Sequence, residues 1–434
     1  MNRQNTSRAL LGLLIAAYLV IGTLYAAFTP TWQVPDEPAH YNYIRALAEG
    51  RGFPVIESED YDQEYLSRLT SEKFPETLPV DAVAYEDHQP PLYYLLAMPI
   101  YWLFGGAVLP LRLFSVALGA VLLLIVHEAV QTIFPARADL PLIATAFVAF
   151  IPQHVAMSAG INNDVLGELV LAGTLWALLA YVDGSTERPW TIGLLLAAAL
   201  LAKTTAYVAV GVAIVAVIIR WRREHPRHPV WAFGQLAWMA IPAMMLTAPW
   251  FLRNASIYGW QDPLGLGAHN AIVEGQPRTV TWLAEYGWAG LLRRMARTTF
   301  HSFWGQFGWM AVVLPRRIYQ ALAGLTLLLS LGLALWLARR PGERRELGHQ
   351  LGLLALSAAF TLGAFLWYNL TFVQHQGRYL FPALIPLSTA AALSLTTLAR
   401  PLPRTLRYVA FGALFAGMAA LDIFCLFRCV IPFL

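Results

Sequence analysis

Charge is scarce in this sequence. Only 13% of its 434 residues are Asp, Glu, Lys or Arg, whereas a soluble domain usually carries about twice that share. Cysteine is rarer still: Cys425 and Cys429 stand one helical turn apart within an apolar run, which argues against a disulfide framework or a metal pair. The sequence lacks a P-loop and a Gly-rich dinucleotide motif, which argues against a cytosolic nucleotide-linked substrate.

Apolar residues dominate instead, at 58% of the chain. Apolar runs of about twenty residues recur from end to end, and each is long enough to span a bilayer. The first run begins at Ala9, and no small-residue cleavage site follows it, so we interpret it as a retained helix rather than a signal peptide. We predict an all-α polytopic protein that forms a single membrane domain over residues 1–434. Its expected spans, about eleven, are residues 9–28, 109–134, 139–157, 163–182, 190–203, 205–221, 230–252, 316–338, 349–370, 379–399 and 407–430.

Basic residues cluster in three short connections between these runs. Because such connections are retained in the cytoplasm, we place all three there, together with residues 1–8 at the N-terminus. If all eleven spans cross, this assignment is consistent along the whole chain. The three clusters are Arg220–Arg227, Arg339–Arg345 and Arg400–Arg407.

One further apolar stretch, Pro91–Phe104, breaks this pattern if it crosses. It is short and interrupted by Pro99, and counting it as a span would move all three basic clusters outside. We therefore expect a re-entrant or interfacial helix, which survives at membrane depth only when it packs on protein or lines a cavity. The resulting topology has two large extracytoplasmic loops, residues 29–108 with juxtamembrane helices and residues 253–315. The expected location is the cytoplasmic (inner) membrane.

The first of these loops carries polar residues at both of its ends. It opens with Asp36 and Glu37, followed one turn later by His40 and Tyr41, and it closes with a second polar group before Pro90. Asp36 ahead of Pro38 also fits an ordinary helix N-cap. A carboxylate pair with a histidine exceeds what one cap needs, so we regard this region as a candidate site. The closing group consists of Glu86, His88 and Gln89.

Other polar residues fall on the same predicted face of the membrane. Asp164 can be a helix cap, and Lys203 can snorkel to the interface, but an ionisable residue at membrane depth is also a functional candidate. Gly377-Arg378 places a guanidinium at a helix start, which suits a phosphate. The full set of candidate substrate- or phosphate-binding residues here is Asn163, Asp164, Lys203, Arg253, Gln376, Arg378 and Tyr379.

A carboxylate base beside an anion clamp suits transfer from a lipid-linked phosphate donor. The carboxylate deprotonates an acceptor hydroxyl, and the cations stabilise the departing lipid phosphate. The carboxylates can alternatively hold a divalent cation, with Asp36, Glu37 and His88 as possible ligands. A transporter or lipid flippase and a non-catalytic protein of envelope assembly remain alternatives, although no repeated halves are evident. The acceptor can be a glycan, a lipid or a protein, and nucleic acid is not expected.

The chain resembles the GT-C-fold membrane glycosyltransferases, and within that class the bacterial DUF2142 family. The resemblance implies an inverting enzyme that uses a polyprenyl-phosphate sugar, with Asp36 as catalytic carboxylate and Glu37 positioning substrate or metal. More distantly, the chain is similar to protein O-mannosyltransferases and aminoarabinose transferases. The mannosyltransferases have His-Pro-Pro where this chain has His88-Gln89-Pro90-Pro91. The segments that carry the resemblance are Pro35–Tyr41, His88–Tyr94, Asn162–Asp164 and Gln376–Pro382.

Overall fold

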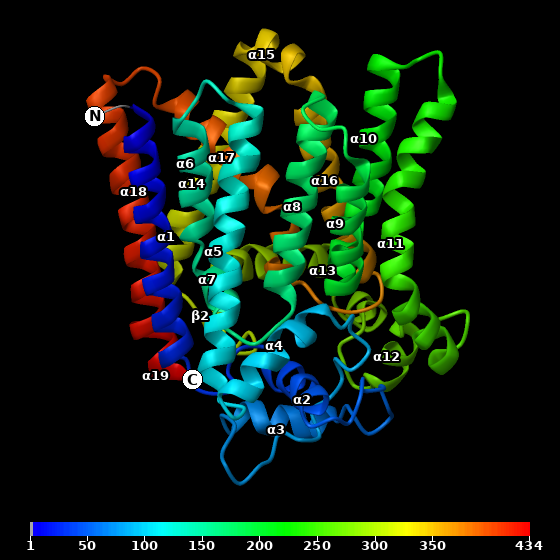
Figure 1. Ribbon diagram of the computed structural model, residues 1–434. Coiled ribbons are helices and arrows are strands. Elements are labelled where there is room, and N and C mark those ends of the chain that lie inside the picture. The colour runs from blue at the N-terminus through cyan, green and yellow to red at the C-terminus, as the bar shows by residue number, and fades with distance from the viewer. Residues whose placement is uncertain (1–2) are drawn as a thin grey trace.

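The computed structural model describes residues 3–434, so residues 1 and 2 of the expected cytoplasmic N-terminus lie outside the described part. Its core is a bundle of long helices (Figure 1). Within residues 3–434, nine helices are long and apolar enough to cross a membrane, or ten if a bent pair counts as one. The long helices and the 3-10 turns that extend two of them are α1 (Arg3–Phe28), α5 (Val108–Ile133), α8 (Asp164–Asp183), η1 (Thr204–Tyr207) with α10 (Val208–Glu224), α11 (Pro229–Tyr258), α14 (Arg316–Arg339), α16 (Gly348–Tyr368), η2 (Gly377–Ala383) with α17 (Leu384–Leu398), and α18 (Arg404–Cys425).

The all-α membrane fold is therefore confirmed, with a count close to the eleven predicted spans. Two of those spans are irregular. The expected span 139–157 is the bent pair, α6 (Asp139–Ala149) and α7 (Pro152–Ser158), with 68° between the two helices. Pro152 stands at the start of α7, and the missing N–H and ring of a proline break a helix at that point. The expected span 190–203 is α9 (Pro189–Ala202), which has only 14 residues.

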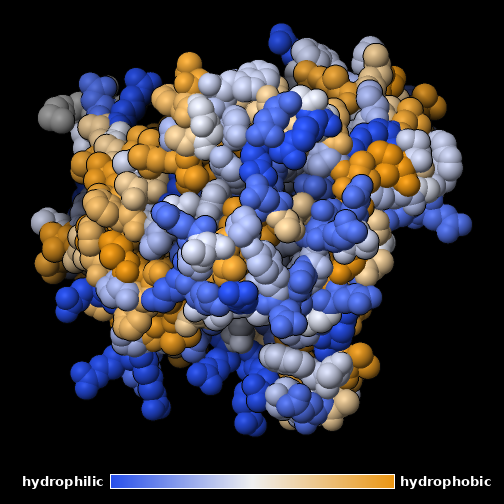
Figure 2. All heavy atoms as spheres, turned by 90° about the horizontal axis from the view of Figure 1, so that it is seen from below, coloured by the Kyte–Doolittle hydropathy of each residue, from blue (hydrophilic) through white to orange (hydrophobic). Residues whose placement is uncertain are grey.

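Shorter elements gather mainly at the lower end of the bundle in Figure 1. Seen from below, hydrophilic side chains cover much of the centre of this end, and apolar ones lie toward its margin (Figure 2). The remaining elements of the chain are α2 (Glu37–Ala48), α3 (Gln63–Ser71), α4 (Leu92–Leu103), α12 (Leu266–Ile272), α13 (Thr279–Trp304), β1 (Gln306–Phe307) paired antiparallel with β2 (Val312–Val313), α15 (Pro341–Glu346), π-helical η3 (Leu426–Val430) and α19 (Ile431–Phe433).

The three basic connections lie together at the opposite, upper end. These are the α10–α11 connection, α15 with its flanks, and the α17–α18 connection, and α1 also begins at this end (Figure 1). Helix α4, the apolar segment that the sequence marks as non-crossing, lies at the lower end against α2, where Tyr94 stacks on Tyr43 at 3.6 Å between ring centroids. Its 12 residues extend over about 18 Å, which is less than a bilayer core.

Large apolar side chains remain exposed along the outer helices. Met244 and Met245 of α11 and Leu327 of α14 are each about two-thirds or more exposed. In water such a surface would be an aggregation liability, whereas in a bilayer it contacts lipid tails. The chain is therefore a membrane protein, and its apolar core lies inside the bundle among helices that include α1, α5, α6, α8 and α17.

Cysteine labelling tests which end of the bundle faces the cytoplasm. In a background with Cys425 and Cys429 replaced by serine, Thr77→Cys at the lower end is expected to react with a membrane-impermeant maleimide in intact spheroplasts. Glu346→Cys at the upper end is expected to react only after lysis, because positive connections stay inside. Labelling of both positions from the same side would contradict this orientation.

Candidate active site

A cavity of about 190 Å³ lies between the lower-end loops and the ends of the long helices. Its polar wall comes from segments far apart in the sequence: the loop before α2, the loop before α4, the α9–η1 junction and η2. Its other wall is largely apolar and comes mainly from the end of α16. The polar lining residues are Asp36, Glu86, His88, Gln89, Lys203, Thr204, Thr205, His269, Thr361, Tyr368, Arg378 and Tyr379, and the rest are Leu266, Ala364, Phe365, Trp367 and Pro382.

Asp36 presents its carboxylate to this cavity rather than to its own helix. It precedes α2 in a left-handed conformation with φ 67°, and its side chain makes no capping hydrogen bond. One carboxylate oxygen accepts from the Tyr85 hydroxyl at 2.7 Å, and the other accepts from Arg378 Nη2 at 2.5 Å. Positive φ in a non-glycine residue costs free energy and tends to occur at functional sites. The capping alternative therefore does not describe what this side chain does.

The ionisation of Asp36 follows from these contacts. Burial by itself raises the pKa of a carboxyl, because it disfavours the charged form. Here the neighbouring Arg378 guanidinium and the Tyr85 hydroxyl outweigh burial, and the pKa of Asp36 falls to about 2. Asp36 is therefore an anion throughout the physiological pH range.

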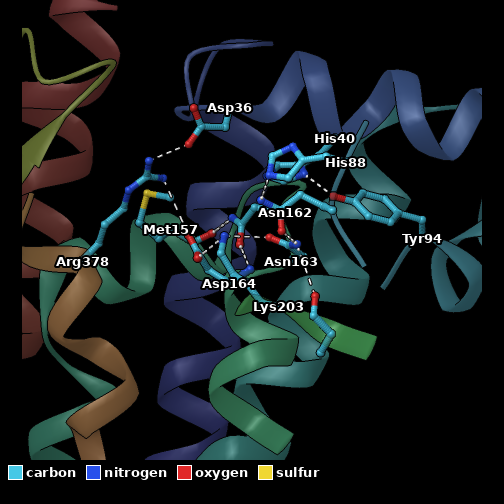
Figure 3. A network of polar contacts seen from close by, with 12 residues as sticks. Asp36, His40, His88, Tyr94, Met157, Asn162, Asn163, Asp164, Lys203 and Arg378 are labelled. Atoms are coloured by element: carbon cyan, nitrogen blue, oxygen red, sulfur yellow. Dashed lines mark hydrogen bonds and ion pairs between the residues drawn. The ribbon is translucent and has the colours of Figure 1, made fainter. Parts of the chain in front are cut away.

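A second carboxylate, Asp164, completes an alternating row of charges (Figure 3). Its Oδ1 lies 2.6 Å from Lys203 Nζ, and its Oδ2 lies 3.7 Å from Arg378 Nη1. Lys203 also donates to Asn163 Oδ1 at 2.7 Å. Lys203 is thus held by two partners inside the protein, which is not the geometry of snorkelling, and Asp164 is an ion-pair partner rather than only a helix start.

The hydrogen bonds continue from Asn163 around the cavity and close on themselves. Asn163 Nδ2 donates to Gln89 Oε1 at 3.2 Å, Gln89 Nε2 lies 3.4 Å from His88 Nε2, and His88 Nδ1 lies 3.3 Å from the Tyr85 carbonyl oxygen. Tyr85 then returns to Asp36 through its hydroxyl. We call this closed set of contacts the polar ring; its members are Lys203, Asn163, Gln89, His88, Tyr85, Asp36, Arg378 and Asp164.

The position of Arg378 depends on the glycine before it. Gly377 N donates to Ser302 Oγ at 2.7 Å, and a Cβ at Gly377 would lie 2.3 Å from Phe303 N and 2.4 Å from Thr299 O. Only glycine lets η2 approach the backbone of α13 this closely. The Gly-Arg pair therefore serves a packing role as well as the anion-binding role that the sequence indicates.

Glu37, the other predicted catalytic residue, points away from the cavity. Its carboxylate is fully buried and forms a double contact with Arg112, from Nε at 2.7 Å and Nη2 at 2.6 Å. It also accepts from the backbone N–H groups of Trp32 at 3.0 Å and Ile161 at 3.1 Å. All of its acceptor capacity is used by the protein, so we infer that Glu37 holds the chain in place and does not contact substrate.

Six other predicted binding residues also lie outside the cavity lining: Asn163 and Asp164, which belong to the polar ring, and His40, Tyr41, Arg253 and Gln376. His40 is buried and its Nδ1 lies 2.9 Å from the Tyr94 hydroxyl, while Tyr41 donates to the Gly106 carbonyl. Arg253 donates to the carbonyls of Phe53 and Pro54, both at 2.7 Å, and Gln376 donates to Gln374. Arg253 in particular fastens the first loop to α11 instead of joining the phosphate clamp.

The sequence reasoning missed several residues that shape the site. His269 of α12 packs on His88 with ring centroids 4.5 Å apart, and Trp367 and Tyr368 end α16 at the cavity wall. Arg112 was missed because it lies within the apolar run of α5. An arginine within an apolar run is expected to have an oppositely charged partner. That expectation was the signal in the sequence that could have identified Arg112. No comparable signal marks His269.

The possible metal ligands do not come together. Among the residues that the structure describes, no group of three His, Cys, Asp or Glu side chains is placed to hold a metal ion. Asp36, Glu37 and His88 are therefore not such a set, and Glu37 in particular is already occupied by Arg112.

The family follows from comparison with known sequences. The family model for "Predicted membrane protein (DUF2142)" matches residues 79–387. The chain belongs to this family. The match runs from the middle of the first loop into α17 and includes every member of the polar ring except Asp36. No protein among the curated ones matches the chain by sequence.

Solved structures show the same overall fold. ArnT from Cupriavidus metallidurans bound to undecaprenyl phosphate superposes with a TM-score of 0.53 at 15% identity, over 97% of this chain and 73% of that one. The apo state of the same protein gives a TM-score of 0.53 at 15% identity, over 98% of this chain and 74% of that one. The apo oligosaccharyltransferase of Archaeoglobus fulgidus gives a TM-score of 0.50 at 13% identity, over 97% of this chain but only 55% of its own length. The chain therefore has a GT-C-like fold, and the resemblance expected from its sequence is confirmed.

The buried ion pair of Glu37 and Arg112 yields a stability test. Glu37→Gln leaves the Arg112 charge buried without a counter-charge, and this is expected to cost about 3–5 kcal/mol of unfolding free energy. Glu49→Gln is the matched control, because Glu49 pairs with Arg51 at the surface and such pairs contribute about 1 kcal/mol or less. Thermal melting in detergent measures both. Equal shifts for the two variants would contradict the structural role of Glu37.

Proposed function

We propose that this protein is a membrane glycosyltransferase that moves a sugar from a polyprenyl-phosphate donor to an extracytoplasmic acceptor. The observation that carries the proposal is the cavity lined by Asp36, Arg378 and Lys203, in which the Asp36 carboxylate pairs with Arg378 and the Lys203 ammonium pairs with Asp164. A base and two fixed cations in one pocket, bounded by membrane helices, suit attack on a sugar whose leaving group is a lipid phosphate. The shared fold supports this class of reaction.

The two cations keep donor capacity for a phosphate. Arg378 Nε is buried and has no partner in the structure, although the residue lines the cavity. Lys203 carries three N–H donors, of which two contact Asp164 and Asn163. A phosphate oxygen placed between them would accept charge-assisted hydrogen bonds. These bonds strengthen as the phosphate leaves the sugar, because negative charge then develops on it.

The pair with Arg378 holds the pKa of Asp36 low. A carboxylate paired this tightly to Arg378 is a weak base. We propose that the bound donor phosphate draws Arg378 toward itself, which loosens the pair and makes Asp36 more basic where the acceptor hydroxyl binds. The direct, single attack that this arrangement implies inverts the sugar carbon. We further propose that the lower end, with this site, faces away from the cytoplasm, and that the protein resides in the cytoplasmic membrane.

Removal of the base is expected to abolish transfer without unfolding the protein. Asp36→Asn keeps the shape of the side chain and loses its basicity, so the rate should fall by about 10²-fold or more. The measurement is release of undecaprenyl phosphate from a panel of undecaprenyl-phosphate sugars in proteoliposomes, with melting temperature as the folding control. Undiminished release by this variant would remove Asp36 from the catalytic role.

Binding of undecaprenyl phosphate tests whether Arg378, rather than Arg253, contacts the lipid phosphate. Arg378→Gln is expected to weaken binding of undecaprenyl phosphate by about tenfold or more, since a buried charge-assisted contact contributes about 1.5–3 kcal/mol. Arg253→Gln is expected to leave binding unchanged, because Arg253 lies outside the cavity. The opposite order of effects would refute the clamp. Rapid lipid scrambling by the wild-type protein in vesicles without a sugar donor would favour the flippase alternative instead.

A further inference from the structure

The members of the polar ring fix which atom donates and which accepts in each of its hydrogen bonds. Lys203 can only donate hydrogen bonds, so the atom of Asn163 that lies 2.7 Å from Nζ is the carbonyl oxygen. The amide nitrogen of Asn163 therefore points the other way. It lies 3.3 Å from the Ala202 carbonyl, which can only accept, and 3.2 Å from Gln89 Oε1. Two independent contacts thus fix the same orientation of the Asn163 side chain.

The orientation passes from Gln89 to His88. Because Gln89 Oε1 accepts from Asn163, its amide nitrogen faces His88 Nε2 at 3.4 Å. An amide N–H only donates, so His88 Nε2 must be a bare acceptor. On the other side of the ring, His88 Nδ1 lies 3.3 Å from the carbonyl of Tyr85, which only accepts. Both contacts therefore require the proton on Nδ1 and none on Nε2.

We infer that His88 is a neutral histidine with its proton on Nδ1, and that it acts as a positioning residue for Asp36 through Tyr85. The link is direct, because one residue provides both contacts: the Tyr85 carbonyl binds His88, and the Tyr85 hydroxyl binds Asp36 Oδ1 at 2.7 Å. With Arg378 on the other oxygen, the Asp36 carboxylate is held from both sides. The consequence for catalysis rests on the proposed function, whereas the protonation state does not.

The surroundings of His88 keep it neutral. Burial lowers its pKa, and the titratable groups around it act in the same direction. These groups are His269 of α12, Lys203 at the α9–η1 junction and His40 of α2. A proton on Nε2 would also point at the amide N–H of Gln89, so protonation would break the polar ring at that contact.

Nitrogen NMR tests the protonation state without any substrate. The protein is labelled with ring-¹⁵N histidine, and the His88 signals are identified by their loss in His88→Gln. The expected result is a protonated Nδ1 and a bare Nε2 from about pH 8 down to about pH 6. A proton on Nε2, or an imidazolium in that range, would overturn the inference.

Gln89→Glu tests the direction of the ring. A carboxylate cannot donate to His88 Nε2, so a proton is expected to appear on Nε2 and the Tyr85 ¹³Cζ resonance is expected to shift. Gln131→Glu makes the same chemical change at a partly buried glutamine near the end of α5 that binds the Pro135 carbonyl, and it should alter neither signal. A Tyr85 signal that stays unchanged in Gln89→Glu would overturn the positioning role.

Activity then separates this inference from the proposed function. Gln89→Glu is expected to slow sugar transfer by about tenfold through misplacement of Asp36. Full transfer by this variant would also overturn the positioning role. If the wild-type protein transfers no sugar at all, the proposed function fails, while the two NMR measurements still decide the state and role of His88.

Discussion

The buried ion pair between Glu37 and Arg112 holds the site together. Arg112 lies in α5, and besides Glu37 it donates to the carbonyls of Ala26, Thr29 and Pro30 at the end of α1. One guanidinium therefore binds backbone carbonyls at the end of α1 and the Glu37 carboxylate at the start of α2. Because Glu37 is anchored inward, Asp36, the residue before it, is turned toward the cavity in its left-handed conformation. Two adjacent carboxylates thus acquire opposite roles.

The charges around the cavity are unevenly distributed between fixed and titratable groups. Three carboxylates, Asp36, Asp164 and Glu86, face two cations, Arg378 and Lys203. Burial raises the pKa of the Glu86 carboxyl above its usual value. The nearby histidines are kept neutral, since burial lowers the pKa of His40, His88 and His269. The site therefore concentrates its fixed positive charge on Arg378 and Lys203.

The fold converts distant polar segments into neighbours. Asp36 and Arg378 are 342 positions apart along the chain, yet they meet because α1 ends and η2 begins at the same end of the bundle. The break between α6 and α7 contributes to the same end: Gln153 of α7 accepts from the N–H of Gln306, next to the end of α13. Irregular backbone of this kind is tolerated near membrane depth where it packs on protein or lines a cavity. The membrane helices thereby provide a frame, and the connections between them provide most of the polar side chains of the candidate site.

The sequence by itself determined that this is an all-α membrane protein, and it predicted several residues that line the candidate site. Apolar run length and the placement of arginines are local properties of the sequence, so the long helices and the gathering of the basic connections at one end of the bundle were predictable. The different contacts of Asp36 and Glu37 were not predictable, because they depend on Arg112, which belongs to another helix. The same holds for Arg253, which binds Phe53 and Pro54 rather than the clamp. Only the tertiary structure decides which charges meet, because burial and partner distance, rather than residue type, set the role of an ionisable group.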